Sequence, residues 1–214
     1  MSVVAPAVLS ESPDDYKLQI ERIHEFTERV HIDIADGEFA PTFTVGAAQV
    51  WWPQEWTVDI HAMVARPSEH LETLVSLKPN MIIFHAEVSE DIVAVLQHVK
   101  KFGIKAGLAL MRSTVPSTVA PAIQEADHVM IFSGDLGKYG GTASLMQLEK
   151  VRLIKLIKPD VEIGWDGGVT IENAYSLSQG GVDVLNVGKT IATADDPASV
   201  YATLVSEINK HGII

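Results

Sequence analysis

The segment "HIDIADGEF", residues 31–39, places a histidine and two aspartates where apolar residues indicate the end of a buried β-strand. Buried carboxylates are costly unless they are paired, hydrogen-bonded or bound to a cation. Because side chains alternate across a strand, His31 and Asp33 project to the same side. Asp59 and His61 repeat this spacing in the next apolar run, "TVDIHAMV". Side chains of these types can bind a metal ion or transfer protons.

A further carboxylate, that of Asp166, ends the apolar run "VEIGWDGG" and is followed at once by Gly167 and Gly168. If the strands converge, the sequence offers a four-ligand site for one divalent transition metal such as Zn²⁺, Mn²⁺ or Fe²⁺. The alternative is that each residue is only a hydrogen-bonded polar group at a strand end. The candidate ligands are two imidazoles and two carboxylates, those of His31, Asp33, His61 and Asp166.

Eight short apolar runs rich in Val and Ile must position these residues. The runs begin at Val3, Arg29, Thr57, Met81, Ile104, Asp127, Val161 and Val182. Segments of helical period lie between them, and the helical pattern is weakest around "GAAQVWWPQ". Alternating strands and helices indicate parallel strands joined by right-handed crossovers. The sequence therefore predicts an α/β fold, a (β/α)8 TIM barrel forming one domain over residues 1–214, with catalytic groups at the carboxyl ends of its strands.

Composition restricts the partners. The formal net charge is −12, which disfavours nucleic acid, although backbone amides of an acidic protein can still bind a small phosphorylated ligand. The chain has no cysteine, which is compatible with a reducing compartment. It has neither a basic segment followed by a long apolar run near residue 1 nor an apolar run of roughly 20 residues. We expect a cytoplasmic protein that does not bind a membrane.

The sequence resembles one enzyme family over nearly its whole length. "HIDIADGEFAPTFTVG" resembles the H-x-D-x-M-D-G-x-F-V-P-N-x-T-x-G signature of ribulose-phosphate 3-epimerases, and "DIHAMVARP" is similar to that family's D-x-H-L-M-V-x-x-P. The resemblance continues in order through "FHAE", "AGLAL", "WDGGVT" and "GGVDVLNVGKTI". It implies an isomerase of the pentose phosphate pathway that interconverts D-ribulose 5-phosphate and D-xylulose 5-phosphate, or acts on a related phosphosugar.

The resemblance also implies roles for individual residues. The family's single metal ion would be bound by His31, Asp33, His61 and Asp166. The two aspartates would be the catalytic acid and base, because epimerisation beside a ketone removes a proton from one face of C3 and returns one to the other through a planar enediolate. A bound metal ion would stabilise the developing oxyanion.

Other residues are expected around this centre. Met63 and Ile131 are candidates to enclose the two faces of the substrate, with core packing as the alternative for each. Asp36 is expected to bond backbone amides of the turn that starts at Gly37. His85 is either at the mouth of the site or a structural histidine.

The resemblance implies that backbone amides after the sixth, seventh and eighth strands bind the phosphate. The glycines at comparable positions are Gly140, Gly141, Gly167, Gly168 and Gly188. Lys189 stands where the family has a serine, and it either contacts the phosphate or points into solvent.

Several departures from the family pattern fall in the expected substrate pocket. Ala7 replaces a serine, Ala35 replaces a methionine, and "MRST" from Met111 replaces N-P-x-T. They predict retained proton chemistry on a different phosphosugar, or a non-catalytic phosphosugar-binding paralogue. A decarboxylase or aldolase of the ribulose-phosphate-binding barrels is a third reading, but "HIDIAD" lacks the lysine of their D-x-K-x-x-D array.

A homo-oligomer is also expected. Trp51, Trp52 and Trp56 cluster near an early loop and could form a contact between subunits. Burial of these side chains in the core of the same chain is the alternative.

Overall fold

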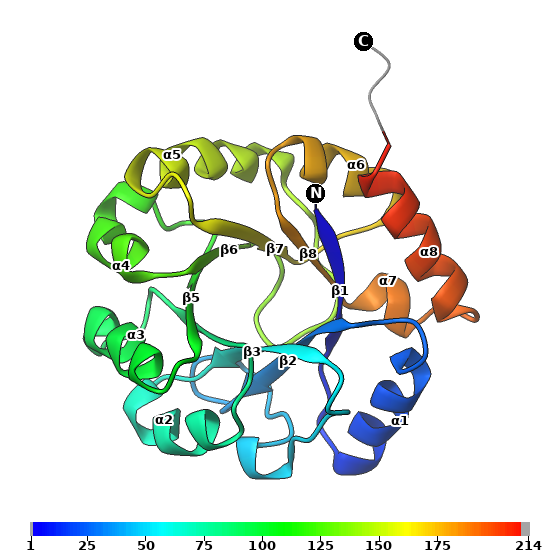
Figure 1. The fold of residues 1–214 in the computed structure, drawn as a ribbon, viewed down its shortest axis with the longest axis horizontal. Helices are drawn as coiled ribbons and strands as arrows, with labels where there is room; N and C mark the ends of the chain where they lie inside the picture. The colour runs from blue at the N-terminus through cyan, green and yellow to red at the C-terminus, as the bar shows by residue number, and fades with distance from the viewer. Residues whose placement is uncertain (1, 211–214) are drawn as a thin grey trace.

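The computed structural model describes residues 2–210, so residues 1 and 211–214 of the expected domain lie outside the described part of the chain. Over this range eight parallel strands close into one barrel in sequence order, and helices surround it (Figure 1). The (β/α)8 prediction is confirmed. The strands are β1 (Val3–Val8), β2 (Arg29–Ala35), β3 (Thr57–Met63), β4 (Met81–His85), β5 (Lys105–Leu110), β6 (His128–Phe132), β7 (Glu162–Asp166) and β8 (Val184–Val187).

The helical layer follows the amphipathic segments of the sequence. The α-helices are α1 (Pro13–Ile23), α2 (Pro67–Ser76), α3 (Ile92–Lys101), α4 (Ala120–Glu125), α5 (Glu149–Ile157), α6 (Ile171–Gln179), α7 (Lys189–Ala192) and α8 (Pro197–Ile208). Three short 3₁₀ helices are η1 (Ala47–Gln49), η2 (Pro116–Val119) and η3 (Leu145–Leu148). The crossover from β2 to β3 holds η1 rather than an α-helix, as the weak pattern there predicts.

Local sequence signals set the helix boundaries. Helix α1 begins after Ser12, whose side chain accepts a hydrogen bond from the backbone N–H of Asp15, and Pro13 occupies the first turn. Helix α8 repeats this pattern, because Asp196 caps the N–H of Ser199 just before a proline. These caps fix where each helix begins.

The alternation of side chains along β2 separates two layers. Val30, Ile32 and Ile34 belong to the large apolar core between the barrel and the helices. Asp33 and Ala35 lie on the opposite side of the strand, toward the barrel interior, where Asp33 lines a cavity. Parallel register pairs Asp33 with His61 of β3 and Asp166 of β7 with Asn186 of β8.

The amino end of the barrel is closed by charged side chains rather than by a ligand site. Arg29 Nε lies 2.7 Å from Asp59 Oδ2, and Arg29 Nη2 lies 2.9 Å from Glu162 Oε2. His128 Nδ1 lies 2.7 Å from the same Glu162 oxygen. Asp59 repeats the spacing of the metal candidates, but it sits one inward position below His61 on β3 and therefore belongs to this cluster.

Within residues 2–210, none of the helices is long and apolar enough to cross a membrane. Trp56 is buried in the core of its own chain, and Trp52 packs against that core. The side chain of Trp51 is 46% exposed, and its backbone carbonyl accepts a hydrogen bond from Tyr16 Oη. The expected subunit contact stays a prediction.

Candidate metal centre and active site

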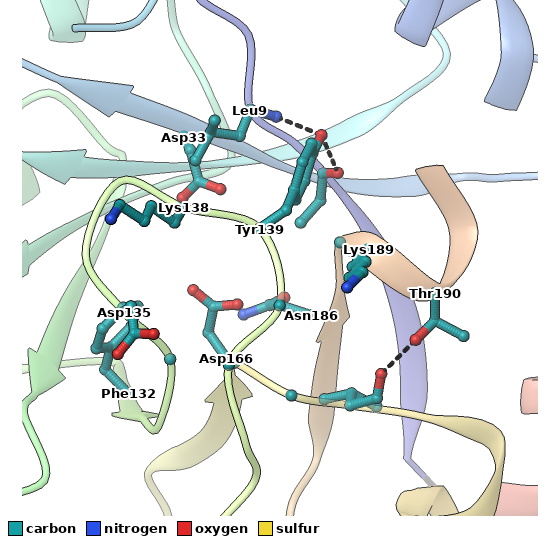
Figure 2. A pocket seen from close by; sticks show the side chains of 18 of the residues that line it. Leu9, Asp33, Phe132, Asp135, Lys138, Tyr139, Asp166, Asn186, Lys189 and Thr190 are labelled. Atoms are coloured by element: carbon teal, nitrogen blue, oxygen red, sulfur yellow. Dashed lines mark hydrogen bonds between the residues drawn. The ribbon is translucent and has the colours of Figure 1, made fainter. Parts of the chain in front are cut away.

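A cavity of about 360 Å³ opens at the carboxyl ends of the strands. Its walls come from the ends of β1, β2, β3, β6, β7 and β8 and from the loop of residues 134–141 (Figure 2). The carboxylates of Asp33 and Asp166 point toward one another across it. This is the end of the barrel at which the sequence predicts catalytic groups.

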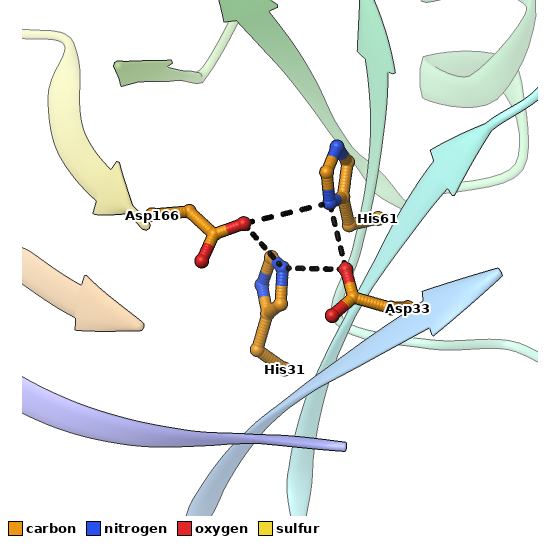
Figure 3. Close-up of side chains that lie close together, drawn as sticks. All are labelled: His31, Asp33, His61 and Asp166. Atoms are coloured by element: carbon orange, nitrogen blue, oxygen red, sulfur yellow. Dashed lines mark hydrogen bonds and ion pairs between the residues drawn. The ribbon is translucent and has the colours of Figure 1, made fainter. Parts of the chain in front are cut away.

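The four predicted metal ligands lie close together (Figure 3), with Asp33 and Asp166 lining the cavity and the two imidazoles buried behind them. His61 Nδ1 lies 2.8 Å from Asp33 Oδ1 and 3.8 Å from Asp166 Oδ2. His31 Nε2 lies 3.4 Å from the same Asp33 oxygen and 4.0 Å from the same Asp166 oxygen. One ligand atom from each residue falls within 4.8 Å of all the others. The sequence separates Asp33 from Asp166 by more than half of the chain, and barrel closure brings them together.

This donor set fits a divalent metal ion. A tetrahedral site with metal–ligand distances of about 2.0–2.2 Å places neighbouring ligand atoms about 3.3–3.6 Å apart, which lies within the observed spread. Among residues 2–210, neither ring nitrogen of the fully buried His31 has a hydrogen-bond partner. Buried polar atoms without partners are rare in proteins. A cation held by His31 Nε2 would supply the partner that this nitrogen lacks.

The electrostatics of the two aspartates differ. Burial alone would raise the pKa of Asp33, but the imidazoles of His31 and His61 hold that pKa below its ordinary value. Burial and then the negative charge of Asp33 raise the pKa of Asp166. Although burial opposes it, the pKa of His31 is raised by the two carboxylates. Two carboxyl groups with oppositely shifted pKa values suit a pair that holds and releases protons in turn.

His85 lies directly behind the predicted ligand His61. Its Nε2 is 2.9 Å from His61 Nε2, and its Nδ1 is 3.2 Å from Glu87 Oε2. Burial lowers the pKa of His85 to about 4, so the ring is neutral at neutral pH. His85 thus contacts a member of the metal set without lining the cavity wall.

Asp36 has the structural role that the sequence predicts. Its Oδ1 accepts hydrogen bonds from the backbone N–H groups of Glu38 and Phe39, each at 2.8 Å, and Oδ2 accepts one from Ala65 N–H at 2.7 Å. The side chain therefore holds the turn after β2 against the end of β3.

All the glycines predicted to bind phosphate line the cavity. Gly140, Gly141, Gly167 and Gly168 have positive φ angles of 97°, 83°, 101° and 70°, which glycine adopts readily. The N–H of Gly168 donates to the carbonyl of Gly140 at 3.0 Å. That amide is thus occupied by a contact between the loops after β6 and β7.

Lys189 lies at the cavity wall, and its side chain packs on the loop after β6. Its Cδ is 3.2 Å from the position that a Cβ on Gly140 would occupy. Lys138, from the same loop as Gly140, also lines the cavity. Two cationic side chains therefore border the glycine-rich wall of an otherwise acidic protein.

The structure places the predicted pocket residues in different surroundings. Ala7 and Met63 line the cavity. Ile131 lies in the apolar core between barrel and helices, because β6 turns Phe132 inward in its place. This corrects the expectation that Ile131 covers the substrate.

Two other departures from the family pattern lie behind the cavity wall. Ala35 packs with Met63 and Ala40 in a small apolar cluster. Met111 is tied to Glu87 through its backbone N–H, with an N···O distance of 2.9 Å.

Tyr139 and Asn186 are among the cavity residues that the sequence analysis did not identify. Tyr139 Oη accepts a hydrogen bond from the N–H of Leu9 at 2.7 Å and so ties the loop after β6 to β1. Asn186 is buried beside Asp166, and its Oδ1 has no partner within the described part of the chain. A signal for Asn186 was available, because it lies two residues before Gly188 and is the one polar residue inside "VLNV".

Comparisons with known proteins agree with this geometry. The sequence model of the ribulose-phosphate 3 epimerase family matches residues 3–192. A ribulose-phosphate 3-epimerase of Helicobacter pylori is 32% identical over 201 residues, covering 90% of this chain and 92% of the relative. One of Schizosaccharomyces pombe is 23% identical over 214 residues, with 97% and 94% covered.

Solved structures share the fold. A 3-hexulose-6-phosphate synthase from Salmonella typhimurium has a TM-score of 0.73 at 14% identity, covering 98% of this chain and all of the other. An orotidine 5'-phosphate decarboxylase from Pyrococcus horikoshii has a TM-score of 0.67 at 13% identity, with 98% of this chain and all of the other covered. These likenesses establish the barrel alone. Because the family model covers most of the sequence, the chain belongs to the ribulose-phosphate 3-epimerase family of isomerases.

Proposed function

We propose that this protein catalyses metal-dependent epimerisation at C3 of a ketose phosphate. The reaction interconverts D-ribulose 5-phosphate and D-xylulose 5-phosphate, or the epimers of a related phosphosugar. The observation that carries the proposal is that Asp33 and Asp166, which line a cavity bordered by glycines and lysines, lie close to two buried imidazoles. This arrangement combines a proton-transfer pair, a cation site and an anion-binding wall in one place.

The residues that would hold the metal ion are His31, Asp33, His61 and Asp166. When bound, a divalent cation supplies Lewis-acid stabilisation of the negative charge that develops on the ketone oxygen. The protein contributes the placement of the carboxylates. Asp33 comes from β2 and Asp166 from β7, so each reaches the cavity from its own side of the barrel.

The two aspartates divide the proton transfer. In one direction Asp33 takes the proton from C3 while Asp166 delivers a proton to the opposite face of the planar enediolate. In the other direction the roles reverse, as reversibility requires. Phe132 and Met63, which line the same cavity, would limit access of water to the carbanion face.

The glycine-rich wall and Lys189 would bind the phosphate. Asn186 lies between this wall and Asp166, because it pairs with Asp166 in the sheet and precedes Gly188 by two residues. In a ketopentose 5-phosphate, C4, which bears a hydroxyl group, lies between the reacting carbon C3 and the phosphate-bearing carbon C5. We place that hydroxyl against Asn186 Oδ1, the buried acceptor that lacks a partner within residues 2–210.

The test is isotope exchange in heavy water. Metal-loaded protein is incubated with a panel of ketose phosphates, and deuterium at C3 is measured by NMR together with the ratio of epimers. We expect inversion at C3 with deuterium incorporation for at least one sugar. If no sugar shows exchange although metal is bound, the protein is a non-catalytic phosphosugar-binding paralogue.

Two isosteric variants then test the division of labour. Asp166→Asn should abolish net epimerisation, yet Asp33 should still exchange the C3 proton of one epimer without inverting it. Asp33→Asn should show the opposite preference. Exchange into both epimers by a single variant, or undiminished epimerisation by either, contradicts the assignment of two bases.

A further inference from the structure

A chain of polar groups leads from the metal centre to Glu87, in the loop after β4. It runs from Asp33 Oδ1 to His61 Nδ1 at 2.8 Å, and from His61 Nε2 to His85 Nε2 at 2.9 Å. It ends where His85 Nδ1 meets Glu87 Oε2 at 3.2 Å. Both imidazoles are fully buried.

Glu87 sets the direction of the chain because its carboxylate can only accept hydrogen bonds. Its Oε1 accepts from the backbone N–H of Met111 at 2.9 Å and from the hydroxyl of Thr114. Burial opposes ionisation, but these donors and His85 hold the pKa of Glu87 below its ordinary value. The remaining oxygen must accept from His85, so His85 carries a proton on Nδ1.

The second nitrogen of His85 then determines the state of His61. The ring of His85 lies between the aromatic rings of Phe39 and Phe132, with centroid distances of 4.9 and 5.5 Å, and such surroundings disfavour a charged imidazolium. A neutral His85 with its proton on Nδ1 has a lone pair on Nε2. His61 must therefore donate from its own Nε2, which turns its Nδ1, 2.8 Å from Asp33 Oδ1, toward the metal centre.

We propose that His85 and Glu87 are positioning residues that hold His61 in the tautomer able to bind a metal ion through Nδ1. The use of Nδ1 as the ligand atom rests on the proposed function, whereas the proton on Nε2 follows from the hydrogen bonds to His85 and Glu87. Without a metal ion, Asp33 Oδ1 accepts a hydrogen bond from His61 Nδ1. Ligating histidines generally need such a partner on the second ring nitrogen. Here the partner is another histidine, backed by a carboxylate that also holds the loop of residues 111–114.

Glu87→Gln is the decisive variant because it keeps the size of the side chain. The amide oxygen must still face the N–H of Met111, since two donors cannot pair. The amide NH₂ then faces His85 Nδ1 and forces that nitrogen to accept. His85 then donates from Nε2, and His61 Nε2 can only accept. The one proton of neutral His61 therefore stays on Nδ1, which cannot bind a metal ion while it carries a proton.

Thr114→Val is the matched control. It removes another hydrogen bond to Glu87 but leaves the contact between Glu87 and His85 intact. Long-range ¹H–¹⁵N NMR of the imidazoles in metal-free protein reports whether His61 Nε2 carries a proton. Competition with a chromophoric chelator reports the affinity for Zn²⁺ alone.

We expect a proton on His61 Nε2 in the parent protein and in Thr114→Val, and none on that nitrogen in Glu87→Gln. We expect Glu87→Gln to bind Zn²⁺ about 10–100-fold more weakly, as is typical for loss of an outer partner of a ligand. His85→Phe fills the space between two aromatic rings and should give a mixture of His61 tautomers. This variant keeps the test decisive if Glu87→Gln fails to fold.

An unchanged tautomer and Zn²⁺ affinity in Glu87→Gln would overturn the proposal. Equal weakening by Thr114→Val would overturn it as well, because Glu87 would then act only by holding the loop. If the parent protein binds no Zn²⁺, the metal site of the proposed function fails, and the tautomers alone still decide this inference.

Discussion

Replacing Gly167 with alanine would push a methyl group into the backbone of the loop that follows β6. A Cβ at this position would lie 2.0 Å from Gly134 N, 2.4 Å from Gly134 Cα and 2.7 Å from the carbonyl carbon of Ser133. These are backbone atoms, so no side chain can rotate away. Gly167 also has a φ angle of 101°, outside the range that alanine adopts readily.

The two effects set the magnitude. A residue with a Cβ in the left-handed region loses about 1–2 kcal/mol, and overpacking of a well-packed site costs about 1–3 kcal/mol more. We therefore expect Gly167→Ala to lower the free energy of unfolding by about 2–5 kcal/mol. For a chain of 214 residues each kcal/mol lowers Tm by about 2–4 °C, which gives a fall of about 4–20 °C.

Gly103 provides the matched control. Its φ angle is 73°, but a Cβ there would meet no atom within 4 Å among the described residues. Gly103→Ala should thus show only the conformational part of the loss, about 1–2 kcal/mol. Thermal unfolding followed by circular dichroism measures both variants. If Gly167→Ala loses no more stability than Gly103→Ala, the close approach of the two loops is not as rigid as the reasoning requires.

Three further outcomes are expected. Lys189→Ala should raise KM for the phosphosugar with little change in kcat, which is the pattern expected when substrate and transition state lose the same binding contact. The control Lys17→Ala, at an exposed lysine, should change neither constant. An unchanged KM in Lys189→Ala would place Lys189 outside the phosphate site. Glu162→Gln should destabilise the protein near neutral pH. Burial opposes the shift, but Arg29 and His128 lower the folded-state pKa of Glu162, so its contribution is present above the unfolded value of about 4.3 and is lost as pH falls. Measured by urea unfolding, the free energy of unfolding should therefore fall less steeply with decreasing pH in Glu162→Gln than in the parent protein. Parallel curves of this free energy against pH would contradict the prediction. Zn²⁺ at about 100 times its Kd for the parent protein should raise the free energy of unfolding by about 2.7 kcal/mol. A similar gain in His61→Ala at the same Zn²⁺ concentration would show that His61 is not a metal ligand.

The barrel could be predicted because its signals are local. Each strand is a short apolar run, and helices begin at caps such as Ser12 or Asp196 that act within three residues. The two-residue spacing of His31 and Asp33 likewise requires a shared side of the strand in any sheet. The role of Asp36 followed from the geometry of the turn beside it. Such features depend on neighbours along the chain and persist in any tertiary arrangement.

Other features depended on which side of a strand faces inward and at what height. Ile131 and Phe132 are both apolar strand residues, and only the closed barrel shows that Phe132 reaches the cavity while Ile131 packs under the helices. Asp59 and His61 share a side of β3, yet strand stagger assigns Asp59 to the charged amino end and His61 to the metal centre.

The contacts behind the site came from the tertiary structure alone. The sequence did not decide whether His85 lies at the mouth of the site or is a structural histidine. Its contacts with His61 and Glu87 form where β3 and β4 lie side by side. The type and spacing of residues along the chain predicted which groups could bind a metal ion or move a proton. Their distances, their burial and the directions of their hydrogen bonds were decided by barrel closure, because these depend on strands far apart in the sequence.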